Sequence, residues 1–105
     1  MNTSTKKILQ KAQKQGYAVG AFNINNMEIA QAVVEAAERE KSPVILQTSE
    51  GAVNYAGMDM LVSISKQVAG RADVPVVLHF DHGKNINMVT AAITEGYDSV
   101  MYDGS

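Results

Sequence analysis

Residues 76–83 read VVLHFDHG, an apolar run that passes directly into a cluster of ionisable side chains. The apolar part is continuous rather than alternating, which is typical of a parallel strand buried on both faces. We therefore predict a strand over 76–79 and place Asp81, His82 and Gly83 in a loop at its carboxyl end. The same order of features, an apolar run followed by polar side chains, occurs three more times in the sequence.

Four strands are predicted in all, near residues 18–23, 44–48, 76–79 and 99–102. Each follows a helix-like stretch, and their starts lie 23 to 32 residues apart, a spacing that suits strand–helix–strand units. Such units build a parallel sheet, so the sequence predicts an α/β fold with no internal linker and no second domain.

Four helices are predicted between and before these strands. The first runs from about Ser4 to Gln15, and Gly16, Gly70 and Gly96 are expected to end the first, third and fourth. The second opens with a capping-box pattern, Asn25 with Glu28, and closes before Pro43. The predicted buried faces are Ile29, Val33, Ala36 and Ala37, then Leu61, Ile64 and Val68, then Ile86, Val89 and Ile93.

Polar side chains gather just past the end of every predicted strand. In chain order they are Asn23, Asn25 and Asn26; Thr48, Ser49 and Glu50; His79, Asp81 and His82; and Asp103 and Ser105. In parallel α/β folds this edge of the sheet is where substrates bind. The sequence thus predicts a binding site at the carboxyl ends of the strands.

Composition excludes several classes of protein. The net charge is −2, and the only lysine-rich segment, Lys6 to Lys14, suits a solvated helix face better than a nucleic-acid surface. No apolar run approaches the ~20 residues of a membrane span. The absence of cysteine excludes disulfides and thiolate ligands and fits a cytoplasmic location. We expect neither nucleic acid nor membrane as a partner.

Four ordered motifs together resemble a known family. They are YAVGAFN (17–23), SPVILQTSEG (42–51), LHFDHG (78–83) and SVMYDGS (99–105). This set closely resembles the N-terminal part of the class II, metal-dependent fructose-bisphosphate aldolases. The resemblance implies a Zn²⁺-dependent lyase of glycolysis, a sugar bisphosphate as substrate and a homo-oligomer. It also implies a (β/α)₈ TIM barrel, which takes roughly 250 residues, so residues 1–105 are expected to form the N-terminal half of one barrel domain.

The resemblance also implies a role for individual residues. His82 matches the first ligand of the catalytic zinc, and Asp103 matches a ligand of a second metal position. Asp81 matches the catalytic acid/base that moves the proton of the substrate's C4 hydroxyl. Asn23 and Ser49 match substrate-contacting residues. Because a catalytic zinc takes about three protein ligands, residues 1–105 alone are expected to be inactive and to bind Zn²⁺ weakly.

The residue types suit this chemistry. Aldol cleavage leaves negative charge on the ketose half, which needs an electrophile. No predicted strand ends in a lysine that could form a Schiff base, whereas a Zn²⁺ ion can polarise the carbonyl. A carboxylate within hydrogen-bond reach can move the hydroxyl proton.

Several interpretations remain open from the sequence. Asp81 could instead cap the following helix, His79 is expected to be packed or hydrogen-bonded rather than a ligand, and Glu50 is expected to be a solvated loop carboxylate. A tagatose-1,6-bisphosphate aldolase would share the same motifs. A flavodoxin-like binding module, or a structural half-barrel that assembles with a partner, are alternatives of other classes, although no GxGxxG or P-loop pattern supports nucleotide binding.

Overall fold

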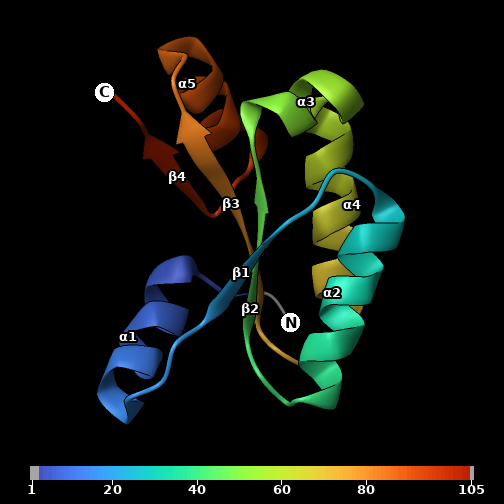
Figure 1. Ribbon diagram of the computed structural model, residues 1–105, viewed down its shortest axis with the longest axis vertical. Coiled ribbons are helices and arrows are strands. Elements are labelled where there is room, and N and C mark those ends of the chain that lie inside the picture. Colours follow the sequence, from blue (N-terminus) through green and yellow to red (C-terminus); the bar gives the residue numbers. More distant parts are fainter. Residues whose placement is uncertain (1–2, 105) are drawn as a thin grey trace.

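The computed structural model describes residues 3–104, and its centre is a twisted parallel sheet (Figure 1). The strands are β1 (Gly20–Asn23), β2 (Val44–Thr48), β3 (Val76–Gly83) and β4 (Ser99–Tyr102). All neighbours are parallel and the order is β1-β2-β3-β4, so the predicted α/β sheet is confirmed. The bounds of β2 and β4 are as predicted. The first strand is two residues shorter than expected and the third is four residues longer.

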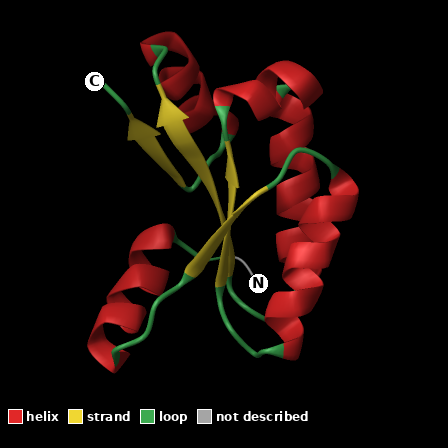
Figure 2. Cartoon of the chain, in the orientation of Figure 1, coloured by secondary structure: helices red, strands yellow, loops and turns green. Residues whose placement is uncertain are grey.

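The helices are α1 (Thr5–Gln15), α2 (Met27–Arg39), α3 (Glu50–Ala56), α4 (Met58–Arg71) and α5 (Ile86–Glu95) (Figure 2). The expected ends at Gly16 and Gly96 are confirmed, since both adopt a left-handed conformation with φ of 75° and 110°. No helix within the described residues is long and apolar enough to cross a membrane.

Two helix predictions were wrong in detail, and one helix was missed. Helix α4 continues through Gly70 to Arg71, because nothing at Gly70 turns the backbone out of the helix. The cap of α2 is Asn26 rather than Asn25, and its side chain accepts a hydrogen bond from the Ile29 amide at 2.8 Å. Helix α3 was not predicted at all, because seven residues are too few to show an apolar period.

One face of the sheet carries the main core beneath α2 and α4. Leu46, Leu78 and Phe80 are fully buried there. The helices pack against the sheet with small side chains, such as Ala30 of α2, which is also fully buried. The predicted buried faces are confirmed in part. Ala37 of α2, Leu61 of α4 and Val89 of α5 are buried as expected, whereas Ile29, Ile86 and Ile93 are exposed.

The other face of the sheet carries a smaller cluster. Ile8 of α1 packs there with Ile45 of β2 and Val77 of β3, and α1 lies on the opposite side of the sheet from α2 and α4 (Figure 1). Side chains alternate between faces along a strand. Gln47 and His79, two residues further along, therefore belong to this same face, at its carboxyl end.

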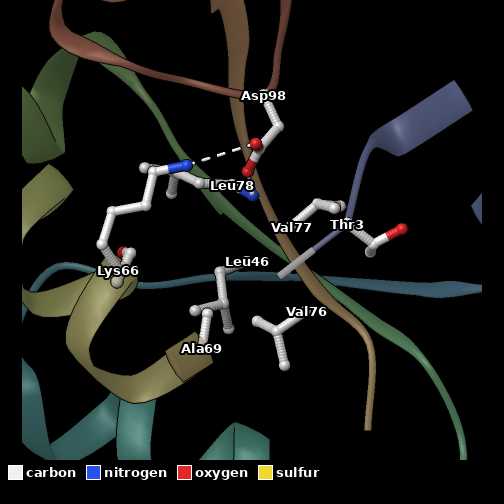
Figure 3. A pocket seen from close by; sticks show the side chains of 9 residues that line it. Thr3, Leu46, Lys66, Ala69, Val76, Val77, Leu78 and Asp98 are labelled. Carbon is white, nitrogen blue, oxygen red and sulfur yellow. Dashed lines mark hydrogen bonds and ion pairs between the residues drawn. The ribbon is translucent and has the colours of Figure 1, made fainter. Parts of the chain in front are cut away.

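The start of β4 is fixed by Asp98. Its Oδ2 accepts a hydrogen bond from the Leu78 amide at 2.8 Å, and its Oδ1 pairs with Nζ of Lys66 at 3.2 Å (Figure 3). These groups border a cavity of about 230 Å³ between α4 and the first half of β3. Ser65 also lines it, and its buried Oγ has no hydrogen-bond partner within residues 3–104. This cavity lies along the first half of β3, before the residues predicted to form the site.

Candidate active site

A row of polar side chains crosses the sheet near its carboxyl edge. The register places Asn23, Gln47, His79 and Ser99 side by side on the four strands. Gln47 donates through Nε2 to Oδ1 of Asn23 at 3.0 Å, and His79 Nδ1 lies 2.7 Å from Oγ of Ser99. Gln47 and Ser99 were not singled out in the sequence, although alternation with the apolar Ile45 could have placed Gln47 on this face.

Asp81 and His82 lie in a bulge at the end of β3, not in a free loop as predicted. Phe80 pairs with Val100 and Gly83 with Tyr102, so two residues of β3 oppose one of β4. The Asp103 amide donates to the Gly83 carbonyl at 2.8 Å and closes the bulge. An extra residue of this kind re-aims side chains, and bulges are frequent beside active sites.

The bulge brings three predicted site residues together. Asp81 lies between two imidazoles: Oδ1 is 3.6 Å from His79 Nε2, and Oδ2 is 3.6 Å from His82 Nε2. The other nitrogen of His82, Nδ1, is 3.6 Å from Oδ2 of Asp103. The Asp81 and Asp103 side chains are only 21% and 20% exposed, whereas His82 is 63% exposed. His82 is thus an accessible imidazole flanked by two sheltered carboxylates.

The backbone at His82 is unusual. Its φ is 50°, a left-handed conformation that few non-glycine residues adopt. Gly83 follows, and a Cβ there would lie 2.6 Å from the Phe80 ring and 2.5 Å from Val89, so no larger residue fits without a shift. Local strain of this kind persists only where surrounding contacts maintain it, and it clusters at functional sites.

The donor types suit zinc, which binds imidazole nitrogen and carboxylate oxygen. His82, expected at the catalytic zinc, and Asp103, expected at a second metal position, are the donors in question, and they lie 3.6 Å apart. Their number is short of a complete site: residues 3–104 contain no group of three or more histidine or carboxylate side chains arranged to hold a metal. The described residues therefore fit a part of a zinc site.

The alternative role of Asp81 as a helix cap is wrong. The N-cap of α5 is Asn85, whose Oδ1 accepts hydrogen bonds from the amides of Asn87 and Met88 at 2.9 and 3.2 Å. Asp81 lies inside β3, four residues earlier. Its carboxylate is therefore not used by the helix.

Asn23 and Ser49 line one shallow cavity of about 350 Å³, together with Tyr55 and five neighbours. Each also has a local partner, since Asn23 accepts from Gln47 and Ser49 accepts from the Ala52 amide at 3.2 Å as the cap of α3. The structure thus brings these two residues to one cavity, while Asp81, His82 and Asp103 form a separate group on β3 and beyond β4.

Glu50 is not the solvated loop carboxylate expected from the sequence. It is half-buried in the first turn of α3, and its Oε2 accepts hydrogen bonds from the backbone amides of Lys84 and Asn85 at 3.1 and 2.9 Å. His79, by contrast, is hydrogen-bonded as predicted.

Behind the site, a buried pair supports the strand ends. Thr48 Oγ1 and Tyr97 Oη are 2.7 Å apart, and the Tyr97 ring meets Phe80 edge to face with centroids 5.6 Å apart. Burial raises the pKa of the Tyr97 phenol above its ordinary value of 10.0, and the hydrogen bond with Thr48 offsets this in part. The phenol is therefore neutral at physiological pH.

Residues 3–105 match the family model described as fructose-bisphosphate aldolase class-II. The chain is 52% identical over 99 residues to a fructose-bisphosphate aldolase of Thermus caldophilus, covering 94% of this chain and 32% of that protein. It is 44% identical over 102 residues to the D-tagatose-1,6-bisphosphate aldolase subunit GatY of Klebsiella oxytoca, covering 97% and 36%. The crystal structure of the YdjI aldolase from Escherichia coli K12 superimposes with a TM-score of 0.91 at 33% identity, over 100% of this chain and 41% of that one. The chain thus spans about a third of the length of these curated relatives.

Proposed function

Because the chain belongs to the class-II fructose-bisphosphate aldolase family, we propose that the protein carrying it cleaves a ketose bisphosphate reversibly by an aldol reaction. Fructose 1,6-bisphosphate is the proposed substrate, with dihydroxyacetone phosphate and glyceraldehyde 3-phosphate as products. One observation carries the proposal: a sheltered carboxylate, Asp81, stands beside an accessible imidazole, His82, at the carboxyl edge of the sheet. Family membership also sets aside the flavodoxin-like binding module.

Asp81 is proposed as the acid/base. In the cleavage direction its carboxylate takes the proton of the C4 hydroxyl while the C3–C4 bond breaks and C4 becomes an aldehyde. The bonding electrons pass to the C2 carbonyl of the other half, giving an enediolate that becomes dihydroxyacetone phosphate when its carbon, the former C3, takes up a proton. In the condensation direction the protonated Asp81 returns the proton. Because the side chain is 21% exposed, it can reach substrate while remaining sheltered from bulk solvent.

His82 is proposed as a ligand of the catalytic Zn²⁺, and Asp103 as a ligand at a second metal position, with further ligands from outside residues 3–104. The bound ion would supply a Lewis acid for the charge that develops on the carbonyl oxygen. Asn23 and Ser49, which line one cavity, are proposed to contact the substrate.

The four-stranded sheet is proposed to form half of a (β/α)₈ barrel, with residues 1–105 as part of one domain. The unpaired sides of β1 and β4, at the two edges of the sheet, are where further strands would add. A homo-oligomer acting in glycolysis in the cytoplasm is the corresponding proposal for the whole protein.

A tagatose-bisphosphate aldolase is a second candidate, favoured by the 44% identity to GatY. The two substrates differ only in the configuration at C4. The test is to supply each ketose bisphosphate to the full-length protein and measure dihydroxyacetone phosphate, before and after chelation and after Zn²⁺ is restored. We expect zinc-dependent release from the fructose compound. Equal release after complete chelation, or none from either substrate, would contradict the proposal.

A further inference from the structure

Glu50 forms a bridge between two strand ends that are distant in sequence. It begins α3, directly after β2, yet its Oε2 atom holds the amides of Lys84 (3.1 Å) and Asn85 (2.9 Å), 34 and 35 residues later. Both amides lie between the last residue of β3 and the first residue of α5, where neither strand nor helix supplies an acceptor. A single charged oxygen thus satisfies two consecutive amides, and such charge-assisted bonds are stronger than neutral ones.

The backbone that Glu50 holds is the one that positions the bulge. Gly83 stands between His82 and the bridged amides, and on one side it is packed against Phe80 and Val89. The His82 side chain is 63% exposed, so packing of the imidazole does little to fix its own left-handed backbone. The neighbouring peptide groups also restrain it: the Gly83 carbonyl accepts from the Asp103 amide, and Glu50 holds the next two amides on the α5 side.

The bridge also couples two groups of predicted site residues. Glu50 follows Ser49, which lines the shallow cavity with Asn23, whereas the bridged amides follow Asp81 and His82. We propose that Glu50 is a positioning residue whose carboxylate fixes the Asp81–His82 bulge relative to the Ser49 turn, so that acid/base, metal ligand and substrate contacts keep one arrangement. This inference rests on the proposed function for its catalytic consequence, but its structural and metal-binding consequences do not depend on activity.

The test compares three substitutions in the full-length protein. Glu50→Gln keeps an acceptor oxygen at the same reach, Glu50→Asp keeps the charge but withdraws it by one methylene, and Glu50→Ala removes both. Glu35→Ala, an exposed carboxylate of α2, is the matched control. The readouts are amide hydrogen exchange of Lys84 and Asn85, Zn²⁺ affinity by chelator competition, and kcat and KM for the ketose bisphosphate.

We expect exchange at the two amides to accelerate in Glu50→Asp and Glu50→Ala, with Zn²⁺ affinity and kcat falling about tenfold or more, the size typical of lost supporting contacts around a metal site. Glu50→Gln should restore most of each property, and Glu35→Ala should match wild type. If Glu50→Ala fails to fold, the other two variants still decide. Glu50→Gln keeps the length of the side chain without its charge, and Glu50→Asp keeps the charge on a shorter side chain. A Glu50→Asp protein with wild-type exchange and zinc affinity would overturn the inference. If wild type shows no aldol cleavage, the proposed function fails, while exchange and zinc binding still test Glu50.

Discussion

Nε2 of His79 lies 3.6 Å from Oδ1 of Asp81, while Nδ1 of the same ring lies 2.7 Å from Oγ of Ser99. Thr5 donates its hydroxyl proton to Ser99 Oγ at 3.1 Å, which leaves the Ser99 proton available for Nδ1. In that arrangement the ring carries its own proton on Nε2, toward Asp81. In this tautomer the Nε2 proton faces one oxygen of the proposed acid/base, and the other oxygen faces His82.

Replacing His79 should impair Asp81 without removing the metal. We expect His79→Ala to lower kcat about tenfold to a hundredfold, as for other outer contacts of a site, because Asp81 loses a neighbour that orients it. His79→Gln, which can still donate an N–H, should recover part of the loss, and zinc content should stay near wild type in both. Steady-state kinetics with zinc per subunit checks this. Equal kcat in His79→Ala and wild type would show that the contact between His79 and Asp81 does not contribute to catalysis.

Substitution should distinguish the role of Asp81 from that of His82. Asp81→Ala removes the proposed acid/base, whose proton transfer is typically worth 10²–10⁴-fold, and should lower kcat with zinc content close to normal. His82→Ala removes the proposed zinc ligand and should lower both zinc content and activity. Because Asn85 rather than Asp81 caps α5, Asp81→Ala should also keep its thermal midpoint, whereas a lost cap costs about 1 kcal/mol. Normal turnover in Asp81→Ala, or full zinc in His82→Ala, would refute the assignment.

The sheet could be predicted because its strands are locally encoded. The strand Val44–Thr48 begins with three apolar residues and follows Pro43, and the structure keeps those bounds. The extension of β3 to Gly83 could not be predicted in the same way. Asp81 and His82 have the composition of a loop, and only pairing with β4, nearly twenty residues later, makes them part of a strand.

The strand ends that carry the candidate site could be predicted from the sequence, but the contacts that support those residues could not. Parallel strands bring their carboxyl ends to one edge, so the gathering of Asp81, His82 and Asp103 follows from order alone. The bridge from Glu50 depends on how α3 sits over the β3–α5 turn, and neither its seven-residue helix nor its backbone partners leave a pattern in the sequence. Supporting contacts of this kind are set by tertiary packing.

Ser65 offers a prediction about stability away from the site. Its Oγ is buried against the cavity between α4 and β3 without a hydrogen-bond partner in the described chain, an arrangement that carries a desolvation penalty of about 1–3 kcal/mol. Alanine is also the better helix former. We expect Ser65→Ala to raise the thermal midpoint of the protein, with exposed Ser63→Ala of the same helix as control for helix propensity. A midpoint that falls in Ser65→Ala would mean that the hydroxyl is satisfied in solution.

Tyr97 should make stability fall at alkaline pH. Its pKa is raised in the folded protein, chiefly by burial, so above pH 10 the unfolded chain loses this proton first and the folded chain binds more protons. The stabilising contribution is therefore complete below pH 10 and is lost as the pH rises toward the folded-state pKa. Tyr97→Phe should flatten the alkaline part of the curve of unfolding free energy against pH.

At neutral pH, Tyr97→Phe should lower the free energy of unfolding by about 1–3 kcal/mol, because Thr48 Oγ1 is fully buried and loses its partner. Adding Thr48→Val, which removes the orphaned hydroxyl, should recover part of that cost, and exposed Tyr55→Phe should leave the curve unchanged. Denaturant melts of the four proteins from pH 7 to pH 11 check this, and an alkaline slope that persists undiminished in Tyr97→Phe would assign the effect to other groups.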